Sequence, residues 1–371
     1  MRTSNGMTFD ELALEQNINQ ILSNKKDAYM LNDFFTDEKI VKALNENDFD
    51  TIFSEWKSKS SAYNISTGFL AEILIASDID FLPYISEIEN SIFYENHSDW
   101  LLSIIIPSNI QYIGKYAFSY CKSLASIIIP NKVTSIGEYA FNNCPSLTSI
   151  TIPDSVTSIG EAAFYECSSL TSITIPDSVI SIGGEAFSYC ESLKSITIPN
   201  KVTAIDERTF NHCESLEHIT IPDSVISIGN RAFYYCESLK AIKIPNSVTS
   251  IGGAAFYRCS SLTSIIIPEN ITAINNEAFS YCESLKYITI PNKVTRVGKY
   301  AFYSCSSLTS VTISGSVTYI DTYCFYECPN LKEITYLGTR SQWKKIKKRP
   351  AWCDYPIEVN CTDGVLKYEN K

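Results

Sequence analysis

The sequence predicts an α/β solenoid, in which short repeats stack so that their strands form a parallel β-ladder. A small helical subdomain is expected before the ladder and a cap after it. Three observations predict this class: a 23-residue period fills most of the chain, its apolar positions coincide in every copy, and both ends depart from it. One such short unit cannot bury its apolar side alone, so neighbouring units must stack.

Cysteine marks the period most clearly, and phenylalanine and leucine recur in step with it. Ten full units, each called a rung below, run from Leu101 to Asn330, and Leu331 opens a further partial copy. Adjacent strands lie about 4.8 Å apart, so ten rungs make a rod or arc about 48 Å long. The periodic cysteines are Cys121, Cys144, Cys167, Cys190, Cys213, Cys236, Cys259, Cys282, Cys305 and Cys328.

The rung from Leu147 to Ser169 shows how each half of a unit is expected to fold. Leu147, Ile150 and Ile152 form an alternating pattern that predicts a strand buried on one side. Pro153 lacks an amide donor, so the hydrogen-bonded ladder must stop there. Further along, Val156 and Ile159 are expected to point inward again.

Gly160 is then expected to allow a turn with positive φ. Its counterparts in three other rungs are Asp206, Asn275 and Asp321. Asparagine and aspartate tolerate the left-handed conformation best after glycine, which favours this interpretation. On the return side, Ala163, Phe164 and Cys167 should fill and close the core.

The two ends are expected to cap the stack. Residues 79–100 are interpreted as a degenerate capping rung, because Ile85, Ile88, Ile92 and Phe93 repeat the spacing of the inward positions. Residues 331–371 begin as a partial rung and then depart into a carboxy-terminal cap. The basic run from Trp343 to Arg349 in this cap is expected to be a solvated helix face. The alternatives are contact with an acidic partner, with a phosphate-bearing surface, or with the acidic amino-terminal region of a second copy.

Residues 1–78 are interpreted as an acidic helical subdomain. Thr8 and Thr36 are suitable helix caps, and a third helix is predicted from Thr67 to Ser77. The first helix would run to Leu22 and the second to Leu44, each with an apolar stripe for packing.

With these residues in view, the rungs resemble the leucine-rich repeats of the BspA-like family, found in bacterial surface proteins and some protozoan parasites. ITIPDSVTSIGEAAFYECSSL carries the resemblance, and so do YLGTRSQW from Tyr336 and CTDG from Cys361. The resemblance implies a leucine-rich-repeat solenoid over about residues 101–364. It further implies attachment to host proteins, whereas the first residues of the sequence do not show the pattern expected of a secretory leader.

Composition and charge restrict the function further. Hydrophobic residues make up 45% of the chain and charged residues 19%, as in a folded protein. No apolar run is long enough for a transmembrane segment. The net charge of −11 argues against nucleic acid as a partner. The first residues lack the apolar core of a secretory signal, so we expect a cytoplasmic protein, or a secreted or cell-surface one whose leader was removed.

The cysteines are expected to form a buried ladder of reduced thiols rather than disulfides or a metal site. Cys353 and Cys361 lie outside the column, and a bond between them is the alternative. The three histidines share no rung position and have no carboxylate at a catalytic spacing. No phosphate-binding or nucleophile motif occurs, so we expect no enzyme, no cofactor and no metal.

Two outward-facing columns remain for binding. Threonines such as Thr151 line the outer side of the first strands, where Ile128, Lys243 and Ile266 are exceptions. This stripe is interpreted mainly as β-propensity, with a binding face as the alternative. His218 stands at a strand position that serine holds in most rungs.

The second column consists of tyrosines after the core phenylalanine, with glutamates nearby. Stacking along the solenoid is the favoured interpretation, and a protein interface is the alternative. The tyrosines are Tyr120, Tyr165, Tyr189, Tyr234, Tyr235, Tyr257, Tyr281, Tyr303 and Tyr326. The candidate partner-binding residues are seven of these tyrosines and three residues on or beside the first strands. They are Tyr165, Tyr189, Tyr234, Tyr235, Tyr257, Tyr281, Tyr303, His218, Lys243 and Tyr287.

The sequence therefore predicts a non-enzymatic protein-binding scaffold that acts through the solenoid surface, and an adhesin if it is secreted. The alternative is an intracellular adaptor or effector that uses the helical region as a second interaction module. Self-association is a further possibility, because the acidic amino-terminal and basic carboxy-terminal regions differ in charge.

Overall fold

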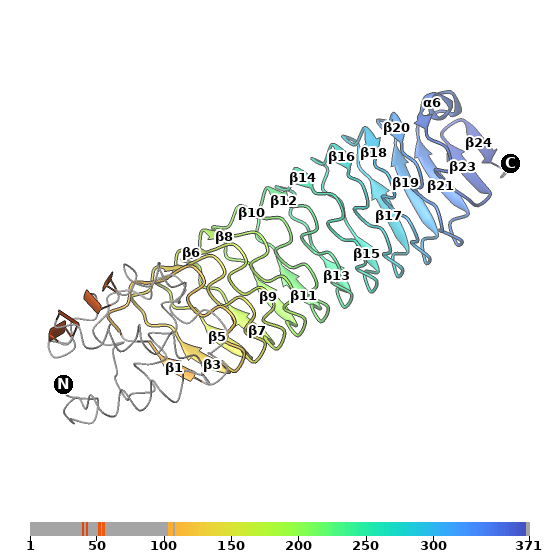
Figure 1. Cartoon of the computed structure of the whole chain (residues 1–371). Coiled ribbons are helices and arrows are strands. Elements are labelled where there is room, and N and C mark those ends of the chain that lie inside the picture. Colours follow the sequence, from red (N-terminus) through yellow and green to blue (C-terminus); the bar gives the residue numbers. More distant parts are fainter. Residues whose placement is uncertain are drawn as a thin grey trace.

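The computed structural model is a parallel β-solenoid, and it describes residues 39–40, 42–43, 51–52, 54–55, 103–106 and 108–368. The rungs follow one another along an elongated coil, with the first strands in one row and the second strands in another (Figure 1). Each rung contributes one strand to each row, and most neighbouring strands of a row pair in parallel at a spacing of 23 residues. Ser149, Ile150 and Thr151 thus lie beside Ser172, Ile173 and Thr174.

The first row of strands continues to the carboxy-terminal end. It comprises β1 (Ser103–Ile105), β3 (Ser126–Ile128), β5 (Ser149–Thr151), β7 (Ser172–Thr174), β9 (Ser195–Thr197), β11 (His218–Thr220), β13 (Ala241–Ile242), β15 (Ser264–Ile265), β17 (Tyr287–Ile290), β19 (Ser310–Ser314), β21 (Glu333–Leu337), β23 (Ile357–Cys361) and β24 (Gly364–Tyr368). All pairings along this row are parallel except that of β23 with β24, which is antiparallel. An antiparallel strand thus ends the parallel ladder.

The second row consists of two-residue strands. These are β2 (Tyr112–Ile113), β4 (Ser135–Ile136), β6 (Ser158–Ile159), β8 (Ser181–Ile182), β10 (Ala204–Ile205), β12 (Ser227–Ile228), β14 (Ser250–Ile251), β16 (Ala273–Ile274), β18 (Arg296–Val297), β20 (Tyr319–Ile320) and β22 (Lys347–Lys348). The second residue of each strand from β2 to β20 is buried. The inward positions predicted at Val156 and Ile159 are therefore confirmed.

The core lies between the two rows and repeats in every rung. The phenylalanines from Phe118 to Phe325 are fully buried, and consecutive rings are nearly parallel with centroids 5.2 to 5.7 Å apart. The periodic cysteines are buried free thiols. Each Sγ from Cys144 onward donates to the carbonyl of a phenylalanine in the preceding rung, as from Cys167 to Phe141 at 3.1 Å. The predicted ladder of buried thiols is thus present, and from Cys144 onward each thiol of the column has a backbone carbonyl as its hydrogen-bond acceptor.

The return side of each rung is a run of turns, so the predicted α/β class is corrected to a solenoid that is nearly all sheet. α6 (Arg340–Lys345) is a short helix outside the ten rungs. Lys39, Ile40, Lys42 and Ala43 are helical and lie in the second predicted amino-terminal helix. The first and third predicted helices, and the degenerate rung at 79–100, lie outside the described residues, so the helical subdomain stays a prediction.

The carboxy-terminal segment corrects the expectation of a wholly solvated basic face. In α6, Trp343 is fully buried, and its indole N–H donates to the Tyr368 hydroxyl at 2.8 Å. Lys348 lies half-buried over the Trp343 ring and donates to the carbonyls of Trp343 and Ile346. Burial lowers the pKa of Lys348 to about 8. Cys353 and Cys361 are free thiols, so the alternative of a bond between them is not found.

Candidate functional site

The return side of the rungs places the tyrosines through an alternating pattern of backbone hydrogen bonds. In one rung the amides of Ala162, Phe164 and Glu166 donate forward to carbonyls of the next rung. Those of Tyr165 and Cys167 donate back within their own rung. Ala162 and Glu166 have φ of 50° and 57°, which turns their amides along the solenoid axis. This alternation replaces the continuous bonding of a helix.

Positive φ therefore falls on different residues from those expected. The two left-handed positions of a rung are held by non-glycine residues in all ten rungs, among them Tyr189, Arg208 and Tyr281. Gly160 and the other glycines of its column are not left-handed, since Gly364 is the glycine with positive φ among the described residues. Asp206, Asn275 and Asp321 are likewise absent from the left-handed set, so the prediction of a positive φ in this column was wrong.

The candidate tyrosines form one continuous row of ring contacts, called the tyrosine ladder below. They occupy two adjacent columns, and contacts within a column are stacked whereas most contacts between columns are tilted. Tyr234 stacks on Tyr257 at 4.7 Å and 13°, while Tyr257 meets Tyr281 edge-on at 5.2 Å. The ladder comprises Tyr165, Tyr189, His212, Tyr234, Tyr235, Tyr257, Tyr281, Tyr303 and Tyr326. The favoured interpretation, stacking along the solenoid, describes this geometry.

Two members of the column were missed by sequence reasoning. His212 lies between the rings of Tyr189 and Tyr235, at centroid distances of 4.5 and 4.4 Å. Two rungs beyond His212, the Arg258 guanidinium packs against the rings of Tyr235 at 5.1 Å and Tyr281 at 5.7 Å. When all rungs are aligned position by position, both residues fall in the tyrosine column. The 23-residue period could therefore have predicted that His212 and Arg258 lie beside the tyrosines.

Carboxylates surround the ladder. His212 Nδ1 lies 3.4 Å from Glu214 Oε1, so this histidine has a carboxylate neighbour two residues along the chain. Burial, with a smaller contribution from Glu166, raises the pKa of Tyr165 to about 12. A hydrogen bond to Glu327, assisted by burial, raises the pKa of Tyr303 further. The phenols of Tyr165 and Tyr303 therefore remain protonated donors at neutral pH.

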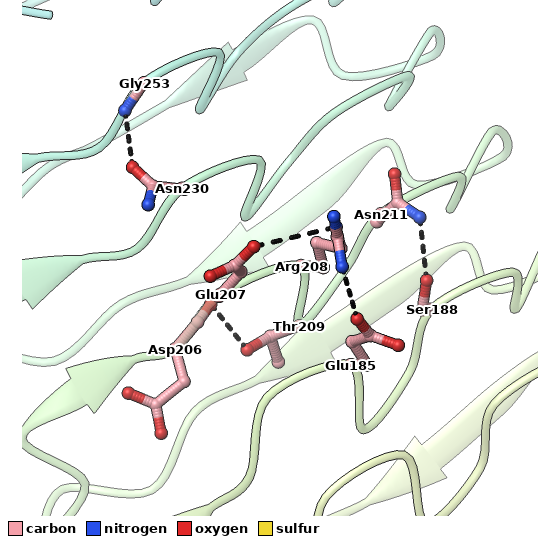
Figure 2. Close-up of polar contacts among 9 residues, drawn as sticks. All are labelled: Glu185, Ser188, Asp206, Glu207, Arg208, Thr209, Asn211, Asn230 and Gly253. Atoms are coloured by element: carbon pink, nitrogen blue, oxygen red, sulfur yellow. Dashed lines mark hydrogen bonds and ion pairs between the residues drawn. The ribbon is translucent and has the colours of Figure 1, made fainter.

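Between the tyrosines, smaller polar residues hold the same column. Asn211 donates through Nδ2 to Ser188 Oγ at 2.8 Å, and both side chains are buried (Figure 2). Arg208 in the same rung contacts Glu185 at 2.7 Å and Glu207 at 3.7 Å. These side chains bridge successive rungs and fix the corner beside the ladder.

His218, Lys243 and Tyr287 do not lie in the tyrosine ladder. All three lie on or beside strands of the first row and are exposed, with Tyr287 57% accessible. The surrounding strands present serine and threonine outward, and Ile266 nearby is 81% exposed. The structure therefore divides the candidate residues into two separate surfaces.

The described residues contain no group of three or more histidine, cysteine or acidic side chains that could hold a metal ion. Among the same residues, no helix is long and apolar enough to cross a membrane.

The family follows from the repeats. The model of the BspA type leucine-rich repeat region matches residues 42–171, 86–217, 157–282 and 226–348, which together cover most of the chain. This protein therefore belongs to the BspA-type leucine-rich-repeat family. A comparison with curated proteins found no significant match.

Solved structures of bacterial repeat proteins are similar to this chain. A leucine-rich cell surface protein from Faecalibacterium prausnitzii shares 32% identity, with 66% of this chain and 90% of that one covered and a TM-score of 0.35. A leucine-rich-repeat protein from Bacteroides ovatus shares 27% identity, covering 75% and 88%, with a TM-score of 0.43. The pneumococcal vaccine antigen PcpA shares 20% identity, covering 75% and 85%, and its TM-score of 0.52 supports the fold.

Proposed function

We propose that this protein is a non-enzymatic, adhesin-like scaffold that binds another protein through the tyrosine ladder. The observation that carries the proposal is a continuous row of half-buried rings across eight rungs, from Tyr165 to Tyr326 and including His212, with carboxylates beside the phenols. Half-exposed tyrosines add rigid contact area at little conformational cost, and their hydroxyls tolerate both water and a partner. Family membership supports the same role, because leucine-rich repeats commonly provide binding surfaces.

A pull-down compares the two candidate surfaces. The first variant changes Tyr234, Tyr235 and Tyr257 to serine, at the centre of the ladder. The second restores the repeat pattern on the first row by His218→Ser, Lys243→Thr and Tyr287→Ser. We expect the first variant to recover at least about tenfold less partner, a loss typical of an interface hot spot, and the second to match the unchanged protein.

A third variant separates binding from packing. Changing the same three tyrosines to phenylalanine keeps the ring contacts while removing the hydroxyls. Thermal unfolding of all variants shows which of them keep the fold. Full partner recovery by a folded serine variant would remove the ladder from the binding surface, and loss with the second variant alone would move the site to the first row.

A second candidate function is an intracellular adaptor that uses the amino-terminal region as a further interaction module. The specific observation in its favour is the thiol ladder, because reduced cysteines persist in reducing compartments.

A further inference from the structure

Arg258 shows which kind of group the tyrosine ladder accepts. In successive rungs one column reads Tyr189, His212, Tyr235, Arg258 and Tyr281, so a guanidinium takes the place of a ring. It lies against the rings on both sides and donates from Nη1 to the Tyr235 hydroxyl at 3.0 Å. The chain's own arginine is therefore an internal example of a planar cation bound by these tyrosines.

A row of carboxylates runs beside this column. It consists of Glu191, Glu214, Glu237 and Glu283, all at the same position two residues after the column, and is called the glutamate row. The contact of Glu214 with His212 shows that the row reaches the ladder. Glu237 also acts electrostatically on Arg258. Carboxylates and phenol oxygens accept hydrogen bonds from the fork of a guanidinium.

The ring faces restrict the partner further. Where rings of the ladder stack, as Tyr234 does on Tyr257 and His212 does between Tyr189 and Tyr235, the stacked faces are already covered by the chain's own rings. Stacking of a nucleobase needs a free aromatic face, and the adjacent carboxylates repel its phosphates. A cationic hydrogen-bond donor needs no free ring face, and it is attracted by the carboxylates and phenol oxygens.

We propose that the tyrosine ladder and glutamate row together bind an extended, arginine-bearing segment of a partner protein. This proposal rests on the proposed function and names its partner chemistry. Glu191, Glu237 and Glu283 are successively two rungs apart. Two rungs span about 10 Å, close to one turn of a polyproline II chain, in which each residue rises about 3.1 Å and every third side chain lies on the same side. Arginines at every third position would therefore meet these carboxylates in turn.

Fluorescence anisotropy with a labelled peptide tests the proposal. The peptide carries arginine at every third position between glycine and serine, and it is titrated with the full chain at about 0.15 M salt. Two control peptides replace arginine by citrulline, which is neutral and of the same shape, or by lysine. We expect the arginine peptide to bind at least about fivefold more tightly than either control.

Matched protein variants locate the site. One changes Glu191, Glu214 and Glu237 to glutamine. The other changes Asp154, Asp177 and Asp223 to asparagine, three exposed acids in the turns that follow the first strands. Both remove three negative charges, but we expect only the first to weaken binding, by about fivefold or more.

Equal weakening by the two variants would show long-range attraction to an acidic protein and would overturn the proposal. Equal binding of the arginine and lysine peptides, or no binding of the arginine peptide, would also overturn it. If the peptide fails while the Tyr234, Tyr235 and Tyr257 variant still loses its partner, the scaffold function stands and only the partner chemistry is wrong.

Discussion

At the scale of single residues, the glycine column shows how closely successive rungs approach. A Cβ built on Gly252 would lie 2.4 Å from the Asn230 nitrogen and 2.5 Å from the Gly229 carbonyl carbon. Both distances are far below van der Waals contact, and both atoms belong to backbone. Glycine is therefore needed here for close approach, not for left-handed φ. Asn275 holds this position in one of the three rungs that lack the glycine, and its side-chain Nδ2 donates to the Ile251 carbonyl at 2.6 Å.

The neighbouring Gly253 provides a matched control for this explanation. A Cβ there would meet the Asn276 oxygen at 3.4 Å, which is ordinary contact. We expect Gly252→Ala to destabilise the protein by about 1–3 kcal/mol, as overpacking does, and Gly253→Ala to have little effect. The urea midpoints of the two variants measure the difference. Equal midpoints would refute the close-approach explanation.

At the scale of repeated elements, the thiol ladder links stability to pH. Burial raises the pKa of Cys190, Cys236 and Cys282, three thiols of the ladder. In the unfolded chain a cysteine ionises near a pKa of about 8.5. Above this pH the unfolded chain releases protons that the folded ladder retains, so the free energy of unfolding must fall as pH rises.

We expect the urea midpoint to be constant below about pH 8 and to fall steeply towards pH 10, since each buried thiol contributes up to about 1.4 kcal/mol per pH unit. The variant with Cys213, Cys236 and Cys259 changed to alanine should lose stability at pH 7 but show a shallower decline. A midpoint that does not change between pH 8 and pH 10 would contradict this linkage.

At the scale of the whole molecule, stability is divided among contacts between adjacent rungs. The hydrogen bonds that join rungs mostly connect residues 22 to 26 positions apart, as from Ser178 to Val156 and from Cys190 to Phe164. A stack built in this way has no single central core, because each rung mainly contacts the rung before and the rung after it. Its length can therefore change without a change of fold.

Deletion of one complete rung, Leu124 to Ser146, tests this modularity. The shortened chain should fold with the same circular dichroism per residue and should be about 4.8 Å shorter by small-angle X-ray scattering. Deletion of residues 124–143 is the control, because it puts the inward columns of the two halves out of register. We expect that control to lose its cooperative unfolding transition, and equal behaviour of the two deletions would refute the nearest-neighbour description.

The sequence by itself determined the parallel solenoid, the inward positions of each strand pair and the buried thiol ladder. Residues such as Ile150, Phe164 and Cys167 recur at a fixed period, and only stacking can bury them. The tertiary structure alone decided the conformation of the return side, where the left-handed residues are Ala162 and Glu166 rather than Gly160. It also joined two tyrosine columns and His212 into one ladder, against which Arg258 packs. The physical reason is that these features depend on contacts with a rung 23 residues away, which local propensities do not encode.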